Sequence, residues 1–236
     1  MPNGPTSGRD LYHQETDLEA PIAEGEKTLQ GTCSSGRRRG ILLEAHKETG
    51  RIEAFSDAVF AIAITLLALD LKVPTPGSTG LVSQLLADWR AHLAYLAAFF
   101  TIAVMYLLHH RLFALIWRAD GLLFLFNFLV LLGVVTIPFW TSVTIGYIRN
   151  PERNVAQLFH GAAFVVPTFF FNVLWWHASH HDLLDPTATP QAVRRTGRVF
   201  ALALVLYIVS FFAAFASDVI STALNGAIAL FFILLP

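Results

Sequence analysis

Apolar runs close to the ~20 residues that a helix needs to cross the hydrocarbon core of a bilayer follow one another along this chain. A soluble domain of 236 residues, 55% hydrophobic and 14% charged, would carry more apolar surface than one core can hide. We therefore predict an all-α polytopic membrane protein with six transmembrane helices. The runs cover residues 52–71, 89–108, 121–148, 155–176, 199–215 and 219–235.

The first 45 residues differ in composition, because they are rich in Gly, Pro, Ser, Thr and charged residues. Such a segment has too few apolar side chains to offset the entropy of folding. We predict a disordered polar tail over residues 1–45 and one six-helix membrane domain over residues 46–236. The tail lacks the apolar stretch of a cleavable signal peptide, so the first hydrophobic helix is expected to act as the targeting signal.

The distribution of Lys and Arg predicts an orientation, since positive charge marks the cytoplasmic side of a membrane protein. The segment through Arg51 and the connections after the second and fourth runs hold 12 of the 16 basic residues. The others, Lys72, Arg90, Arg149 and Arg153, fall in the alternate connections. We expect an even number of spans with both termini cytoplasmic. Nothing in the charge balance indicates a nucleic-acid partner.

The stretch from Arg51 to Asp57, with the sequence RIEAFSD, leads without a break into the first apolar run. Charged residues at the mouth of a span cost free energy unless they are partnered, so this start indicates a functional site. Within the run, Ile62, Leu66 and Leu69 share one helical face, and Thr65 flanks it.

Glu53 and Asp57, themselves four residues apart, point roughly away from this apolar stripe. One side of the helix is therefore apolar, and another side carries charged groups that can anchor it to neighbouring helices. Periodicity alone allows a simpler interpretation, in which the stripe serves ordinary helix packing or lipid contact and the carboxylates are structural.

The pattern Arg51-x-x-x-Phe55-Ser56-Asp57 resembles the RxxxFSD signature of the transmembrane-protein-175 potassium channels, including their bacterial six-span members. The resemblance covers about residues 50–148. It also rests on the sequence AIAITLL at residues 61–67, on His109, His110, Arg111, Leu112 and Phe113, and on Asp120, Asn127, Pro138 and Phe139. The last three runs match only in hydropathy and spacing.

The resemblance implies a homotetrameric, potassium-permeable cation channel of the cell membrane, without a re-entrant filter loop. The first span of each subunit would line the pore. Ile62 stands where the family has a constriction-forming isoleucine, with Leu66 and Leu69 one and two turns further on. Thr65 stands where bacterial members have a threonine implicated in ion preference.

The resemblance further implies a hydrogen-bonded network that holds the pore helix. Arg51, Phe55, Ser56 and Asp57 would form it, with His109 or His110 and Asp120 as partners. No cofactor or metal is expected, and potassium ions and the bilayer are the expected partners.

Two other motifs suggest a different kind of site, but each lacks part of the pattern that such a site needs. TIGYI, at residues 144–148, looks like part of a potassium-channel filter, but it lacks the final glycine and is predicted to be a helix end. His177 and His181 have a spacing compatible with metal binding, yet no further ligand group is evident.

Two other classes of protein remain as alternatives. A secondary transporter or proton-coupled exchanger would need ionisable groups near mid-membrane and usually a repeated fold, whereas only one RxxxFSD copy occurs. An enzyme would need paired acids, an activated nucleophile or several metal ligands within the spans, and none is evident.

Overall fold

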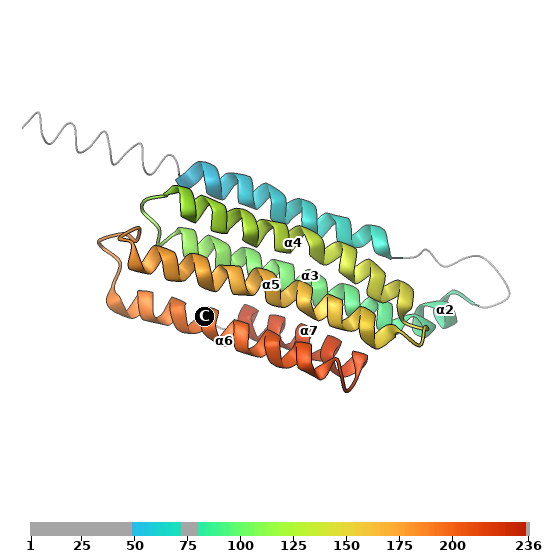
Figure 1. Ribbon diagram of the computed structural model, residues 1–236. Helices are drawn as coiled ribbons and strands as arrows, with labels where there is room; N and C mark the ends of the chain where they lie inside the picture. The colour runs from blue at the N-terminus through green and yellow to red at the C-terminus, as the bar shows by residue number, and fades with distance from the viewer. Residues whose placement is uncertain (1–48, 72–79, 235–236) are drawn as a thin grey trace, which may run out of the picture. The chain divides into compact units, whose positions relative to one another are not determined.

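The computed structural model describes residues 49–71 and 80–234, and the regular elements within them are helices (Figure 1). The predicted tail over residues 1–45 lies outside the described residues. The first helix covers residues 49–67 and continues as the 3-10 helix η1 (Ala68–Asp70). It is followed by α2 (Leu81–Ala87), α3 (Trp89–Phe113), α4 (Gly121–Tyr147), α5 (Arg153–His180), α6 (Pro190–Ala213) and α7 (Asp218–Leu234).

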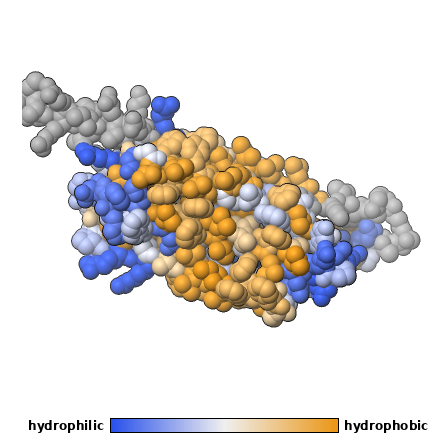
Figure 2. Space-filling model, in the orientation of Figure 1, coloured by the Kyte–Doolittle hydropathy of each residue, from blue (hydrophilic) through white to orange (hydrophobic). Residues whose placement is uncertain are grey.

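α3, α4, α5 and α6 are each long and apolar enough to cross a membrane. They correspond to the second to fifth predicted runs, and Figure 2 shows a broad apolar belt between two hydrophilic ends. α7 is apolar but has only 17 residues, and the first helix carries Arg51, Glu53 and Asp57 within its first turns. The count of six spans stays a prediction.

The helix that contains the fifth predicted run begins before the run itself. α6 starts at Pro190 rather than near Val199, because its polar first turns are helical as well. Thr189 caps the helix, since its hydroxyl accepts a hydrogen bond from the Ala192 N–H at 3.3 Å. Pro190 at the first helical position has no N–H to satisfy and a φ angle already suited to the helix.

α4 and α5 form an antiparallel hairpin with a close contact at Gly133. A Cβ atom on Gly133 would lie 2.9 Å from Cβ of Pro167, so only glycine permits this approach. Small residues at such points let membrane helices pack backbone to backbone. Pro138 lies inside α4, as predicted, and the helix continues through it.

The first helix lies at the edge of the bundle beside α4 (Figure 1). At the end of the bundle where this helix begins, the loops after α3 and after α5 pair with each other. The Trp117 N–H donates to the Leu183 carbonyl at 2.8 Å, and the Asp185 N–H donates to the Leu115 carbonyl at 2.9 Å. These bonds join the loop between α3 and α4 to the loop between α5 and α6.

Candidate functional site

The first helix is held to the bundle by one face. Ile52, Ser56, Phe60, Ala63 and Leu67 are buried, at spacings of three and four residues that place them on one side of a helix. The Phe60 ring meets two rings of α3, with centroid distances of 5.9 Å to Tyr106 and 5.3 Å to His109. This packing fixes the rotation of the helix about its axis.

The opposite face is exposed on the single chain and carries the predicted constriction residues. The exposed fractions are 56% for Ile62, 42% for Leu66 and 78% for Leu69. Phe55, at 51%, continues this face toward the start of the helix. The structure thus brings these side chains together on a surface that the other described residues leave uncovered.

Thr65 lies on the same exposed face, and its hydroxyl group forms a hydrogen bond within its own helix. The hydroxyl donates a hydrogen bond to the Ile62 carbonyl at 2.8 Å. With the hydrogen committed to the helix backbone, the oxygen keeps a lone pair that can accept a further interaction.

A buried polar chain ties the first helix to α3 and α4. The Ser56 hydroxyl donates to the Ile52 carbonyl at 2.8 Å and accepts a hydrogen bond from Nδ2 of Asn127 at 3.0 Å. Oδ1 of Asn127 lies 2.9 Å from Nε2 of His109. Ser56, Asn127 and His109 are all buried, so each depends on the others for hydrogen bonding.

Asn127 is the member of this chain that the sequence did not assign to the network. An asparagine inside an otherwise apolar helix was the available signal, because a buried amide needs polar partners.

The neighbouring histidines serve different partners, because consecutive residues of a helix point about 100° apart. His109 faces inward to Asn127, whereas Nδ1 of His110 lies 2.7 Å from a carboxylate oxygen of Glu53. The side chain of His110 is 62% exposed, so this pair is a surface contact. His109 therefore links α3 to α4, and His110 links α3 to the first helix.

Arg51 and Asp57 do not join the Ser56–Asn127–His109 chain through any hydrogen bond within the described residues. Oδ1 of Asp57 is buried, and no described residue donates a hydrogen bond to it. Arg51 is exposed and lines a cavity of about 570 Å³ together with Phe55, Asp120 and Asn127. The ring of Phe55 meets that of Phe128 edge to face, with centroids 5.8 Å apart.

Asp120 borders this cavity, but its carboxylate interacts with Leu123 and His177. Its carboxylate caps α4 by accepting the Leu123 N–H at 2.7 Å, and it lies 2.8 Å from Nε2 of His177 on α5. Partial burial acts to raise the pKa of Asp120, but the hydrogen bonds from Leu123 and His177 outweigh it, so the pKa lies below its ordinary value. Asp120 thus anchors α5 to the start of α4.

His177 in the last turn of α5 and His181 directly after the helix lie on one side, as their spacing predicted, but they lack the further ligands of a metal site. His177 and His181 stack with ring centroids 4.3 Å apart, but Nε2 of His177 is engaged by Asp120. In the described part of the chain, no group of three His, Cys, Asp or Glu residues could hold a metal ion.

The segment that resembles a filter is helical. Thr144 and Tyr147 lie in the last turns of α4, and the Thr144 hydroxyl donates to the Ala156 carbonyl of α5 at 3.3 Å. The prediction that this segment is a helix end is confirmed.

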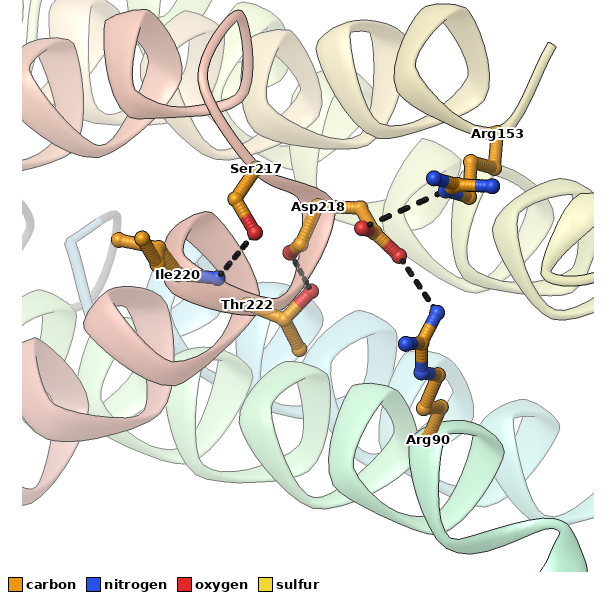
Figure 3. Close-up of polar contacts among 6 residues, drawn as sticks. All are labelled: Arg90, Arg153, Ser217, Asp218, Ile220 and Thr222. Atoms are coloured by element: carbon orange, nitrogen blue, oxygen red, sulfur yellow. Dashed lines mark hydrogen bonds and ion pairs between the residues drawn. The ribbon is translucent and has the colours of Figure 1, made fainter. Parts of the chain in front are cut away.

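At the opposite end of the bundle, one carboxylate joins three helices (Figure 3). Asp218, at the start of α7, lies 3.4 Å from Nη1 of Arg90 on α3 and 3.6 Å from Nε of Arg153 on α5. Its side chain is 16% exposed. The sequence placed both arginines on this side but did not identify their partner.

Comparisons with known proteins agree with this architecture. The family described as "Endosomal/lysosomal potassium channel TMEM175" matches residues 51–138. A potassium channel of Chamaesiphon minutus is 41% identical over 191 residues, which are 79% of this chain and 94% of that protein. A potassium channel of Streptomyces collinus is 39% identical over 188 residues, 78% of this chain and 91% of that one.

A solved structure gives the same result. The crystal structure of a TMEM175 homologue from Chamaesiphon minutus superposes with a TM-score of 0.72 at 39% identity, and the match covers 80% of this chain and 97% of that one. The resemblance inferred from the RxxxFSD pattern is confirmed. Since the similarity extends well beyond that motif and takes in nearly all of the relative's length, this chain belongs to the TMEM175 family.

Proposed function

We propose that this multi-pass membrane protein is a potassium-permeable cation channel whose pore is lined by the first helix. The observation that carries the proposal is the division of that helix into two faces. One face is anchored by the Ser56–Asn127–His109 chain, and the other presents Ile62, Leu66 and Leu69 uncovered. The names of the two bacterial relatives, both potassium channels, support the same function.

The uncovered face is suited to a pore between subunits. In a homotetramer with the first helices around the axis, four Ile62 side chains would meet as an apolar ring, with Leu66 and Leu69 beyond. Such a ring closes a pore by excluding water, and a small outward rotation of the helices would rewet it. Asp57, whose buried Oδ1 has no donor among the described residues, is expected to help hold the first helix in the orientation that assembly needs.

Ion preference would come from Thr65 rather than from a cage of carbonyls. Its hydroxyl oxygen is an acceptor for a partly dehydrated cation, because its hydrogen is committed to the Ile62 carbonyl. An apolar ring offers no ligands that replace hydration water, so the potassium preference is expected to be weaker than that of a carbonyl filter.

The arginines of the described residues support the proposed six-span topology in the cell membrane with both termini inside. Those at the end of the bundle where the first helix begins are Arg51, Arg111, Arg118, Arg194, Arg195 and Arg198. Those at the other end are Arg90, Arg149 and Arg153, of which Arg90 and Arg153 are held by Asp218. The more basic end is expected to face the cytoplasm.

Potassium flux from proteoliposomes tests the channel. Ile62→Asn should leak potassium far faster than the parent protein, because a polar ring no longer repels water. Ile220→Asn makes the same change on α7 at a side chain of almost equal exposure, 54%, and should behave like the parent. Equal flux through Ile62→Asn and the parent would place the constriction elsewhere, and saturable flux coupled to a second ion would indicate a transporter instead.

Assembly is tested separately, by light scattering of the purified protein in detergent. Four copies per particle are expected for the parent, and fewer for Asp57→Ala, because the loss of this carboxylate should loosen the first helix that forms the proposed interface. A parent protein that stays monomeric in both detergent and nanodiscs would contradict a pore formed between subunits.

A further inference from the structure

A second cavity lies at the basic end of the bundle, away from the proposed pore face. It has a volume of about 620 Å³ and lies between the end of α3 and the beginning of α6. Its described lining includes two threonines together with Leu108, Arg111, Leu115, Gln191, Arg195 and Val199. None of them is a carboxylate.

The lining can contact both chemical parts of a phospholipid, the apolar acyl chains and the charged headgroup. Leu108, Leu115 and Val199 form an apolar wall, while the cationic groups come from Arg111 on α3 and Arg195 on α6. The threonine hydroxyls and the Gln191 amide add neutral hydrogen-bonding groups. A soluble anion would use only the polar part of this lining.

The positive charge continues along α6. An adjoining cavity of about 300 Å³ is lined by Gln191, Arg194, Arg195 and Arg198, again without a carboxylate. Arg194 also borders a neighbouring cavity that contains Asp182 and Asp185, so part of its charge is balanced. Among the described residues, Arg111 of this cavity and Arg198 of the adjoining one have no carboxylate within ion-pair distance, so the described lining of the two cavities carries positive charge.

The position in the bundle suits a lipid headgroup. The helices that form the cavity are both long enough to cross a membrane, and the cavity lies where α3 ends and α6 begins. On α6, the exposed side chains of Leu202 and Val205 continue from the cavity toward the middle of the helix. They provide a surface along which an acyl chain can lie.

We propose that this cavity, the α3–α6 site, binds the phosphate headgroup of an anionic phospholipid, with Arg111 and Arg195 as its main cationic contacts. Basic cavities between membrane helices are suited to this role, and each basic side chain near an anionic lipid surface contributes about 1 kcal/mol. The planar guanidinium groups also present paired N–H donors, which permit bidentate contact with a phosphate.

Native mass spectrometry of the purified full-length protein, titrated with phosphatidylglycerol or phosphatidylcholine, tests the proposal. The parent is expected to bind phosphatidylglycerol in preference to phosphatidylcholine. Arg111→Gln/Arg195→Gln should weaken phosphatidylglycerol binding about 10- to 30-fold, which follows from the loss of two such contacts. Arg111→Lys/Arg195→Lys retains the charge and should recover most of the binding.

The matched control is Arg118→Gln/Arg149→Gln, which removes the same charge from positions outside the cavity and should bind like the parent. All variants are compared at equal helix content. The proposal is overturned if the Gln double variant binds like the parent, or if both lipids bind the parent equally. It is also overturned if inorganic phosphate displaces phosphatidylglycerol at similar concentrations, since that result would indicate a site for a soluble anion.

Discussion

The side-chain nitrogen of Asn127 donates a hydrogen bond to the Ser56 hydroxyl across 3.0 Å, inside an otherwise apolar contact between α4 and the first helix. Ser56 and Ile62 are six residues apart, which places them about 120° apart around the helix. Holding Ser56 inward therefore holds Ile62 outward. The orientation of the proposed pore face depends on a bond less than two turns away along the same helix.

The first prediction concerns this bond. Ser56→Ala removes the acceptor and leaves the buried Asn127 amide with an unpaired donor, which should lower the free energy of unfolding by about 1–3 kcal/mol. Ser179→Ala is the control, because that hydroxyl donates to a carbonyl of its own helix at the surface. Heat unfolding in detergent, followed by circular dichroism, measures both, and equal stability of the two variants would show that Ser56 does not anchor the helix.

The two faces of the first helix were predictable because both depend only on a period of 3.6 residues. Ile62, Leu66 and Leu69 recur at helical spacing, and the structure places them on one exposed face. The start of α6 was also predictable, since Thr189 followed by Pro190 is a usual helix N-terminus, but the polar first turns were interpreted as a loop.

The partners of the charged residues were not predictable in the same way. Glu53 pairs with His110, 57 residues away, and Asp218 lies 128 residues from Arg90. Such pairings depend on which helices are neighbours, and the hydropathy of a single chain carries no information on helix order. The sequence could state only that a charge at a span end needs some partner.

The second prediction concerns Thr65. Thr65→Val has nearly the same shape but no oxygen, so the preference for potassium over sodium should fall toward unity. A loss of about 1 kcal/mol of differential stabilisation corresponds to about a fivefold change in permeability ratio. Thr65→Ser retains the hydroxyl and should keep the preference, and bi-ionic reversal potentials that are equal for the Val and Ser variants would exclude this oxygen as the source.

The third prediction concerns Asp218, which joins Arg90 and Arg153 at the other end of the bundle and so acts as a clamp between three helices. Asp218→Asn leaves Arg90 and Arg153 without their shared carboxylate and should lower the free energy of unfolding by about 1–2 kcal/mol. Asp88→Asn also breaks an ion pair, with Arg149, but there both side chains are more than half exposed, so about 0–1 kcal/mol is expected. If urea unfolding shows the same loss for both variants, Asp218 does not act as a three-helix clamp.

The fourth prediction concerns Asp120 and acid. Its pKa is lowered in the folded chain, so between about pH 5 and the folded pKa the unfolded state binds more protons. The stability that the carboxylate provides is therefore present above the unfolded pKa and is lost as the pH falls through the folded pKa.

Asp120→Asn can still cap α4 through its amide oxygen, but it has no group that titrates in this range. Its unfolding free energy should consequently fall less steeply than that of the parent between pH 5 and pH 3. Ser217→Ala serves as the control, because Ser217 caps α7 without a titrating group and its loss should lower stability by a similar amount at every pH. Parallel pH profiles for the parent and Asp120→Asn would mean that the contacts with Leu123 and His177 do not favour the charged form of Asp120.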